Sequence, residues 1–349
     1  MKNIALVLLG ILSFIEIEAQ VLAEKVVKNN TIDLLRNDTI DYKLFLISNI
    51  NLQKYGDYFS EVVQTIYEKS DAKTLFIETG KADEWLFLQY KNSKRFRSNV
   101  GRTSAKNFKE RYKYLLKTDA IDSLDIVSIS MEEDMFYSID VLRDILYKHD
   151  FVDDYSRLGH MVDSLAFLYR DTGLLQAQEL ELIRKKLLNV TFQLKNIDST
   201  DYLYFNEIFD EIISFRTDLY AIPFNSVDFR NRLNYYSLNI INQYLKVNSD
   251  TKKYIAIVSY MSIRRGKDIE FLQRKTSNNK QFVTVAENFS NEACTIKAVM
   301  DWASNSSNNS TNSDISIMKK YALGKKTLFK SNYDSCLLKG NYDYILYLK

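Results

Sequence analysis

KTLFIETGKADEWLFLQYKN, residues 73–92, contains one complete strand-and-helix unit. Its first part, residues 73–79, is a short apolar run, which predicts a strand buried within a sheet. Gly80 ends that strand, and residues 81–92 have the pattern of a helix. A buried strand that leads directly into a helix is the unit from which parallel sheets covered by helices are built.

The alternation of strand and helix continues on both sides of this unit. Further strands are predicted over residues 43–50, 124–130, 253–261, 281–287 and 342–349. Further helices are predicted over residues 57–69 (after a break at Gly56), 104–117, 133–148 and 267–275. The sequence therefore predicts an α/β fold with a mainly parallel sheet flanked by helices.

The stretch from about residue 153 to residue 247 contains no convincing strand. Its segments with helical periodicity are 155–171, 174–188, 203–219 and 226–247. We therefore expect an all-helical insertion between the third and fourth main strands. No internal repeat or linker divides the chain, so residues 24–349 are predicted to form a single α/β domain that contains this insertion.

The first residues have the pattern of a secretory signal peptide. Lys2 precedes an apolar run over residues 4–15, and cleavage sites follow Ala19 and Ala23. The run is shorter than the ~20 apolar residues of a membrane-spanning helix, and no later segment reaches that length. We predict a signal peptide over residues 1–23 and an exported, periplasmic or secreted protein. No cysteine lies near the cut, so a lipoprotein is not expected; a buried N-terminal helix or a retained anchor is the alternative.

Composition limits the functional classes. The chain carries 47 basic and 45 acidic residues, and this balance gives no electrostatic footprint for nucleic acid. Its histidines, His149 and His160, stand at no metal-binding spacing, so neither a metal site nor a cofactor is predicted. Cys294 and Cys336 either pair as a disulfide in an oxidising compartment or are two buried thiols.

Glu78 is the candidate catalytic residue. It lies at the end of an otherwise apolar strand, where a carboxylate is costly unless it is paired or functional. Ligands of open α/β sheets bind beyond the carboxyl ends of the strands, so Glu78 would act there as a general acid or base. In the structural alternative it caps the helix that follows Gly80, or pairs with Lys81 or an arginine.

Polar residues after the other strands are the candidates for ligand binding. Asn49 and Asn51 follow the first strand, Glu132 follows the third, and Arg264 and Arg265 follow the fourth main strand. Carboxylates such as Glu132 can bind a cation, and paired arginines can hold a carboxylate or a phosphate. The alternatives are an acidic helix start and a solvated arginine pair. The predicted partner is an unknown small molecule or protein.

The order of these pieces resembles the erythromycin esterase-like group, part of a wider set that includes the Tiki and haem-uptake-like proteins. Three blocks carry the likeness: residues 43–92, LDIVSISMEEDMFYSIDVLRDIL at 124–146, and KKYIAIVSYMSIRRGKDIEFLQRK at 252–275. FVTVAENFSNEAC and the terminal YDYILYLK follow them. The likeness covers most of the chain and rests on pattern rather than on specific motifs. It implies an α/β fold and an esterase-like active site.

The chain departs from the family at the positions that would react. Active members that resemble esterases have a Gly-Glu-x-x-His type motif after the first strand, where this chain has Ser48-Asn49-Ile50-Asn51-Leu52. They have a Gly-x-Asp-like turn after the third strand, where this chain has Ser128-Ile129-Ser130, and a later histidine, where it has Ser259-Tyr260-Met261-Ser262. Of the residues that would react in an active member of the family, this chain keeps Glu78.

Three functions are compatible with these observations. The favoured one is an exported, catalytically degenerate member of the esterase-like group that binds a ligand or interacts with a partner. The second is an esterase-like hydrolase that uses Glu78. The third is a structural protein of the envelope that has no small ligand.

Overall fold

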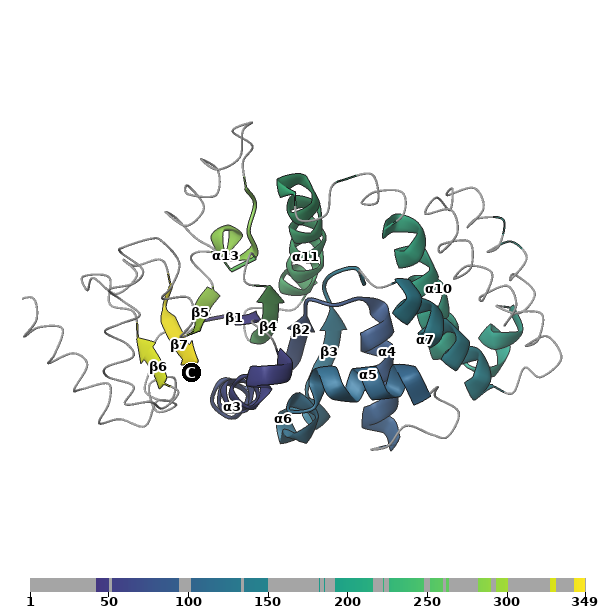
Figure 1. Cartoon of the computed structure of the whole chain (residues 1–349), viewed down its shortest axis with the longest axis horizontal. Helices are drawn as coiled ribbons and strands as arrows, with labels where there is room; N and C mark the ends of the chain where they lie inside the picture. The colour runs from purple at the N-terminus through teal and green to yellow at the C-terminus, as the bar shows by residue number, and fades with distance from the viewer. Residues whose placement is uncertain are drawn as a thin grey trace, which may run out of the picture.

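The computed structural model describes a central sheet and helices that cover both of its faces (Figure 1). The described residues are 42–49, 52–93, 102–132, 135–149, 182, 185, 192–215, 222, 226–247, 252–259, 262–263, 282–289, 293–300, 327–330 and 342–348. The predicted signal peptide over residues 1–23 lies outside them, and so do the predicted helices over 155–171 and 267–275. Of the predicted helix over 174–188, the structure describes two residues, 182 and 185.

Seven strands form one sheet, in the order β3-β2-β4-β1-β5-β7-β6 (Figure 1). Each neighbouring pair is parallel except β6 and β7, which are antiparallel. The predicted α/β fold with a mainly parallel sheet is therefore confirmed. The strands are β1 (Leu44–Asn49), β2 (Thr74–Ile77), β3 (Asp125–Ser128), β4 (Tyr254–Ser259), β5 (Ala293–Met300), β6 (Thr327–Lys330) and β7 (Tyr344–Leu348).

Successive residues of the central strands are buried against opposite faces of the sheet. In β1, Phe45 and Ile47 belong to one apolar core, whereas Leu44 and Leu46 belong to another. Because both faces are covered, these central strands are apolar throughout, and this is why the sequence predicts them as buried strands. Helices on the first face are α3 (Leu52–Ser70), α4 (Lys81–Ser93), α5 (Arg102–Tyr112), α6 (Asp119–Ser123), α7 (Met135–Lys148) and α10 (Ser199–Ser214). Helices on the second face are α11 (Val227–Val247) and α13 (Val285–Asn288).

The described part of the predicted insertion is helical. Between β3 and β4 the structure places α7, α10 and α11. The side chain of Asp198 caps α10, because it accepts hydrogen bonds from the backbone amides of Thr200 and Asp201. No helix among the described residues is long and apolar enough to cross a membrane.

Helix α3 begins earlier than predicted. It starts at Leu52, so Gly56 lies inside the helix and not in a break before it. A Cβ atom on Gly56 would overlap Cδ2 of the Tyr114 ring. The glycine is therefore explained by the close approach of this ring to the helix rather than by a turn.

The predicted strand over residues 281–287 is wrong. Residues 282–284 lie outside any regular element, and Val285–Asn288 form the short helix α13. Thr284 Oγ1 accepts a hydrogen bond from the backbone amide of Glu287 at 3.1 Å. Thr284 and Glu287 stand at the spacing of a helix-starting Thr-x-x-Glu, a signal that outweighs the β-branched residues of this segment.

Candidate functional site

Glu78 follows β2 directly, at the carboxyl edge of the sheet. In the register of the sheet, Ile77 of β2 lies beside Ser128 of β3 and Ile257 of β4, so β2 and β3 end at one level and β4 continues two residues further, to Ser259. The backbone amide of Glu78 donates to the carbonyl of Ile257 at 3.0 Å, which continues the ladder between β2 and β4 by one residue. The side chain of Glu78 is half-buried at this edge.

Both carboxyl oxygens of Glu78 have partners on the segment that ends β4 and follows it. Oε2 accepts a hydrogen bond from the backbone amide of Ser259, and Oε1 lies 3.2 Å from the hydroxyl oxygen of Ser262. Ser262 Oγ also lies 2.7 Å from Oδ1 of Asn234 on α11 and 2.9 Å from Ser259 Oγ. Asn234 donates its own amide to the carbonyl of Val283 at 2.7 Å, which leaves Oδ1 as an acceptor.

The hydroxyl of Ser262 has one proton to share between two acceptors. It cannot donate to Asn234 and to an ionised Glu78 at once, whereas a protonated Glu78 can itself donate to Ser262. Burial raises the pKa of Glu78, and the hydrogen bonds from Ser259 and Ser262 and the charge of Arg230 offset this only in part. Glu78 is therefore placed to hold a proton or to release one.

Glu211 reaches the same edge of the sheet from α10. Its Oε2 accepts a hydrogen bond from the backbone amide of Lys81, the first residue of α4, at 2.9 Å. Its Oε1 is buried and has no hydrogen-bond partner among the residues that the structure describes. Burial raises the pKa of Glu211 well above its usual value, and the charges of Glu132 and Glu84 raise it further, against the opposing effect of Lys81. Glu211, and not Glu78, caps α4.

Gly80 gives Glu211 access to this position. A Cβ atom on Gly80 would lie 2.6 Å from the backbone nitrogen of Glu132 and 2.7 Å from Oε2 of Glu211. The backbone of the turn between β2 and α4 therefore packs directly against the loop after β3 and against α10. Any larger residue would push the carboxyl of Glu211 away from the start of α4.

Asp83, in the first turn of α4, is fully buried and joins three helices. Its Oδ2 accepts from Arg111 at 2.8 Å, from the hydroxyl of Tyr112 at 2.6 Å and from Thr79, and its Oδ1 accepts from the hydroxyl of Tyr137. Burial and the charge of Asp83 raise the pKa of Tyr112 and of Tyr137, so both phenols keep their protons. With each partner engaged inside the protein, Asp83 has a structural role.

Glu84 and Lys81 form a second, more exposed group beside it. Glu84 Oε2 accepts from Lys81 Nζ at 3.0 Å and from the backbone amide of Ser128 at 2.7 Å, and Oε1 accepts from the hydroxyl of Tyr204 at 3.0 Å. Lys81 Nζ also lies 3.6 Å from Glu207 on α10. Among the described residues, the carboxyl groups near this edge outnumber the cations beside them, so this part of the edge is acidic.

The structure places the other predicted site residues as follows. Asn49 ends β1, and its side chain lies outside the described atoms; Asn51, Arg264 and Arg265 lie outside the described residues. Glu132 is half-buried and lies 3.3 Å from Arg111, which also pairs with Asp83, and its backbone packs against Gly80 beside Glu211. Their roles in ligand binding stay predictions.

Sequence reasoning did not single out the helix residues Asn234 and Glu211, because no local pattern links them to the strand ends. The predicted bridge between Cys294 and Cys336 is not tested. Cys294 is buried in β5, and Cys336 lies outside the described residues.

A second polar cluster lies away from the strand ends, where α7 and α10 meet. His149 follows the last residue of α7, and its Nε2 lies 2.6 Å from Oδ2 of Asp201 on α10. Lys148 Nζ lies 2.7 Å from the same oxygen and 3.6 Å from Oδ2 of Asp198. His149, Asp198 and Asp201 are the one group of potential metal ligands found within the described residues. The prediction that neither histidine belongs to such a group overlooked this contact across 52 residues.

Comparisons with known proteins support the fold. A histidine-to-asparagine mutant of the erythromycin esterase EreC, in its open conformation, matches with a TM-score of 0.51 and 12% identity, over 90% of this chain and 92% of that one. A protein from Bacillus cereus matches with a TM-score of 0.48 and 11% identity, over 95% of this chain and 97% of that one. No family model and no curated protein matches the chain. At this identity the likeness shows the fold alone: this chain has an α/β fold similar to that of erythromycin esterase.

Proposed function

We propose that this chain is a ligand-binding protein with an erythromycin esterase-like fold, and that Glu78 contacts the ligand. One observation carries the proposal: the half-buried carboxyl of Glu78 is held at both oxygens, by Ser259 and Ser262, at the carboxyl edge of the sheet. This edge is where open α/β sheets bind their ligands. A carboxyl group whose orientation is fixed in advance loses little conformational entropy when a ligand binds.

Binding is favoured over hydrolysis because of what surrounds Glu78. His149 is the single histidine in the described part of the chain, and its Nε2 bonds Asp201 on α10, whereas the partners of Glu78 are Ser259 and Ser262. In the resemblance, this chain has Ser48-Asn49-Ile50-Asn51-Leu52 and Ser259-Tyr260-Met261-Ser262 in the two stretches where active members have a histidine. Loss of a general-base histidine typically costs ~10²–10⁴ in rate. In the part of the chain that the structure describes, no histidine bonds the carboxyl of Glu78.

The acidic edge indicates the chemistry of the ligand. Two carboxylates, Glu84 at 3.0 Å and Glu207 at 3.6 Å, lie around one ammonium group, that of Lys81. Such a field favours a ligand that offers hydroxyl groups or a protonated amine. Erythromycin is the compound in the name of the structural neighbour, and it is a macrolactone rich in hydroxyls that carries one basic amine. It is therefore the first probe to use.

The test measures binding and turnover in one experiment. The purified chain is mixed with erythromycin and with a panel of hydroxylated lactones. Ligand-observed NMR measures binding, and mass spectrometry detects any conversion of the compound. We expect binding without conversion, and loss of binding in Glu78→Gln. The control is Glu110→Gln, which changes an exposed carboxylate of α5. Equal binding by Glu78→Gln and Glu110→Gln would contradict the proposal.

A second candidate function is a hydrolase, and the contact of Glu78 with Ser262 favours it. A carboxyl with a raised pKa, 3.2 Å from a hydroxyl, has the geometry of a general base beside a nucleophile. In that case a fluorophosphonate would label Ser262, and the label would be absent in Ser262→Ala and weaker in Glu78→Gln. Conversion of a p-nitrophenyl ester that is equal in wild type and in Glu78→Gln would rule the hydrolase out.

We propose export on the basis of the apolar run over residues 4–15 that follows Lys2. Expression of the full chain in a Gram-negative host is expected to give a periplasmic or extracellular product that begins at Gln20 or Glu24. N-terminal sequencing of each cell fraction checks this. Full-length chain confined to the cytoplasm would contradict export and would leave the ligand-binding proposal unaffected.

A further inference from the structure

Three potential metal ligands from two helices converge beside α4. His149 follows α7, Asp198 caps α10, and Asp201 lies in the first turn of α10. Their ligand atoms all lie within 4.8 Å of one another. Asp201 is 1% exposed and the side chain of His149 is 9% exposed, so these groups are largely shielded from water. A tetrahedral ion with bonds of ~2.0–2.2 Å to nitrogen and oxygen holds its ligand atoms ~3.3–3.6 Å apart, so Nε2 of His149 and Oδ2 of Asp201, which lie 2.6 Å apart, separate by about 1 Å to admit it.

Fixed donors orient each carboxylate. Oδ1 of Asp201 accepts from the indole nitrogen of Trp85 at 2.8 Å. Oδ1 of Asp198 accepts from the backbone amides of Thr200 and Asp201 at 3.0 and 3.1 Å. In both residues the remaining oxygen, Oδ2, therefore turns toward the same point. In natural metal sites, hydrogen bonds to the metal-binding side chains hold those side chains in position. They contribute a large part of the affinity for the metal.

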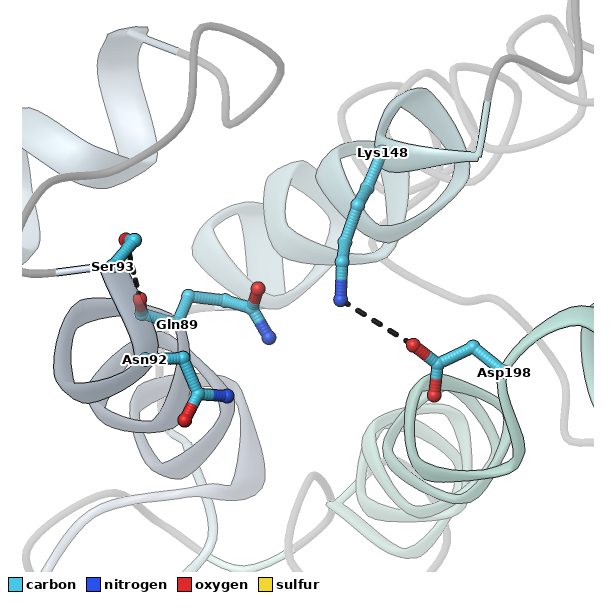
Figure 2. Close-up of a pocket in the computed structure, with 5 residues that line it drawn as sticks. All are labelled: Gln89, Asn92, Ser93, Lys148 and Asp198. Atoms are coloured by element: carbon cyan, nitrogen blue, oxygen red, sulfur yellow. Dashed lines mark hydrogen bonds and ion pairs between the residues drawn. The ribbon is translucent and has the colours of Figure 1, made fainter.

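Lys148 already places a positive charge at that point. Its ammonium group lies 2.7 Å from Oδ2 of Asp201 and 3.6 Å from Oδ2 of Asp198, which shows that the two oxygens favour a cation between them. The side chain of Lys148 also lines a cavity of about 210 Å³, together with Asp198 and with Gln89, Asn92 and Ser93 of α4 (Figure 2). The cavity gives the flexible lysine a polar space into which its ammonium can move when another cation takes its place.

The donor set selects the kind of ion. One imidazole nitrogen and two carboxylate oxygens suit zinc and the neighbouring transition metals, whereas calcium and magnesium prefer oxygen alone. Three protein ligands leave one position of a tetrahedral ion for water. The geometry points to a divalent transition-metal site of the zinc class, formed by His149, Asp198 and Asp201, with Lys148 as the internal cation that the metal displaces. This site is separate from the edge of the sheet where Glu78 lies, and it does not depend on the proposed function.

The test uses the full chain and Zn²⁺ as the probe. Equilibrium dialysis and calorimetry are expected to show one Zn²⁺ bound per wild-type chain. Binding is lost in His149→Ala and in Asp201→Asn, and it is kept in His160→Ala, which removes the other histidine of the chain. Lys148→Gln removes the competing ammonium, so it binds Zn²⁺ about tenfold more tightly. Trp85→Phe frees Oδ1 of Asp201 and weakens binding about 10–100-fold.

A measurement on the wild-type chain avoids variants that fail to fold. In imidazole NMR spectra, Zn²⁺ shifts the resonances of His149 and leaves those of His160 in place. Asp198→Asn, at a half-buried position, is a milder variant that also loses affinity. The proposal is overturned if wild type binds no Zn²⁺, if folded His149→Ala or Asp198→Asn binds as wild type does, or if only Lys148→Gln binds. The last result would mean that Lys148 occupies the cation position permanently.

Discussion

Oε2 of Glu211 accepts a hydrogen bond at 2.9 Å from the backbone amide of Lys81, 130 residues earlier in the chain. Lys81 is the first residue of α4, so a carboxyl from α10 caps a helix that begins at the edge of the sheet. This contact joins the helical insertion to the strand ends beside Glu78. It also leaves Oε1 of Glu211 buried without a hydrogen-bond partner among the described residues.

Replacing Gly80 by alanine is expected to destabilise the protein by about 1–3 kcal/mol. The added Cβ would lie 2.6 Å from the backbone nitrogen of Glu132 and 2.7 Å from Oε2 of Glu211, so one of them must move. Urea unfolding followed by circular dichroism measures the loss. In Gly80→Ala combined with Glu211→Ala, the obstruction by Glu132 remains, so stability is not restored. A Gly80→Ala protein as stable as wild type would contradict the close packing.

The buried carboxyl of Glu211 makes stability depend on pH. Its pKa in the folded protein is raised above the usual 4.5, mainly by burial, so folding favours its protonated form. The stability that this provides is complete below pH 4.5 and is lost as the pH rises through the raised pKa. Within that window the slope approaches about 1.4 kcal/mol per pH unit.

Glu211→Gln removes this dependence, because the amide does not ionise. We expect the free energy of unfolding of wild type to fall relative to that of Glu211→Gln as the pH rises from about 5 to about 8. Urea unfolding of both proteins over this range measures the difference, with Glu110→Gln as the exposed control. Parallel pH profiles for wild type and Glu211→Gln would show that Glu211 is ionised in the folded protein at all these pH values.

Asp83→Asn is expected to destabilise the protein by about 3 kcal/mol. The substitution keeps the shape of the side chain but leaves Arg111 without the buried carboxylate to which it donates at 2.8 Å. Tyr137→Phe removes one hydroxyl that donates to Asp83, so it costs less, about 1.5–3 kcal/mol. The midpoint of urea unfolding is measured for Asp83→Asn, for Tyr137→Phe and for the control Glu110→Gln. If Asp83→Asn unfolds at the same urea concentration as Glu110→Gln, the cluster does not stabilise the fold.

Trp85→Phe is expected to cost about 1–3 kcal/mol. Trp85 is fully buried, and its indole nitrogen donates to Oδ1 of Asp201 at 2.8 Å, so phenylalanine leaves a buried carboxylate oxygen with one donor fewer. Circular dichroism is the suitable probe of unfolding, because the substitution removes a fluorophore. Tyr235→Phe, at a site that is 54% exposed, is the control and should unfold as wild type does. Equal stability of the two variants would show that water replaces the indole.

Sequence patterns predicted the buried strands well. Residues 43–50, 73–79, 124–130 and 253–261 contain β1 to β4, and residues 342–349 contain β7. The central strands β1, β2 and β4 are covered on both faces, so their sequences are continuous apolar runs that need no information from the rest of the chain. The same local pattern placed Glu78 at the end of β2, where a polar residue follows the last buried one.

Local patterns failed where a contact from elsewhere in the chain, or a second local signal, determines the conformation. Gly56 suggested a break, yet the ring of Tyr114 packs against it inside α3. The β-branched residues of 281–287 suggested a strand, yet the cap between Thr284 and Glu287 starts a helix. Strands β5 and β6, near the far edge of the sheet, were not predicted.

The candidate sites divide in the same way. The amino-acid sequence alone identified the α/β class and the carboxyl of Glu78, because both follow from residues that are neighbours in the chain. Only the tertiary structure brought Asn234 and Glu211 to the strand ends and His149 to Asp201. Helix packing sets these contacts between distant residues, and a helix sequence specifies which of its residues are buried but not which strand end or helix they meet.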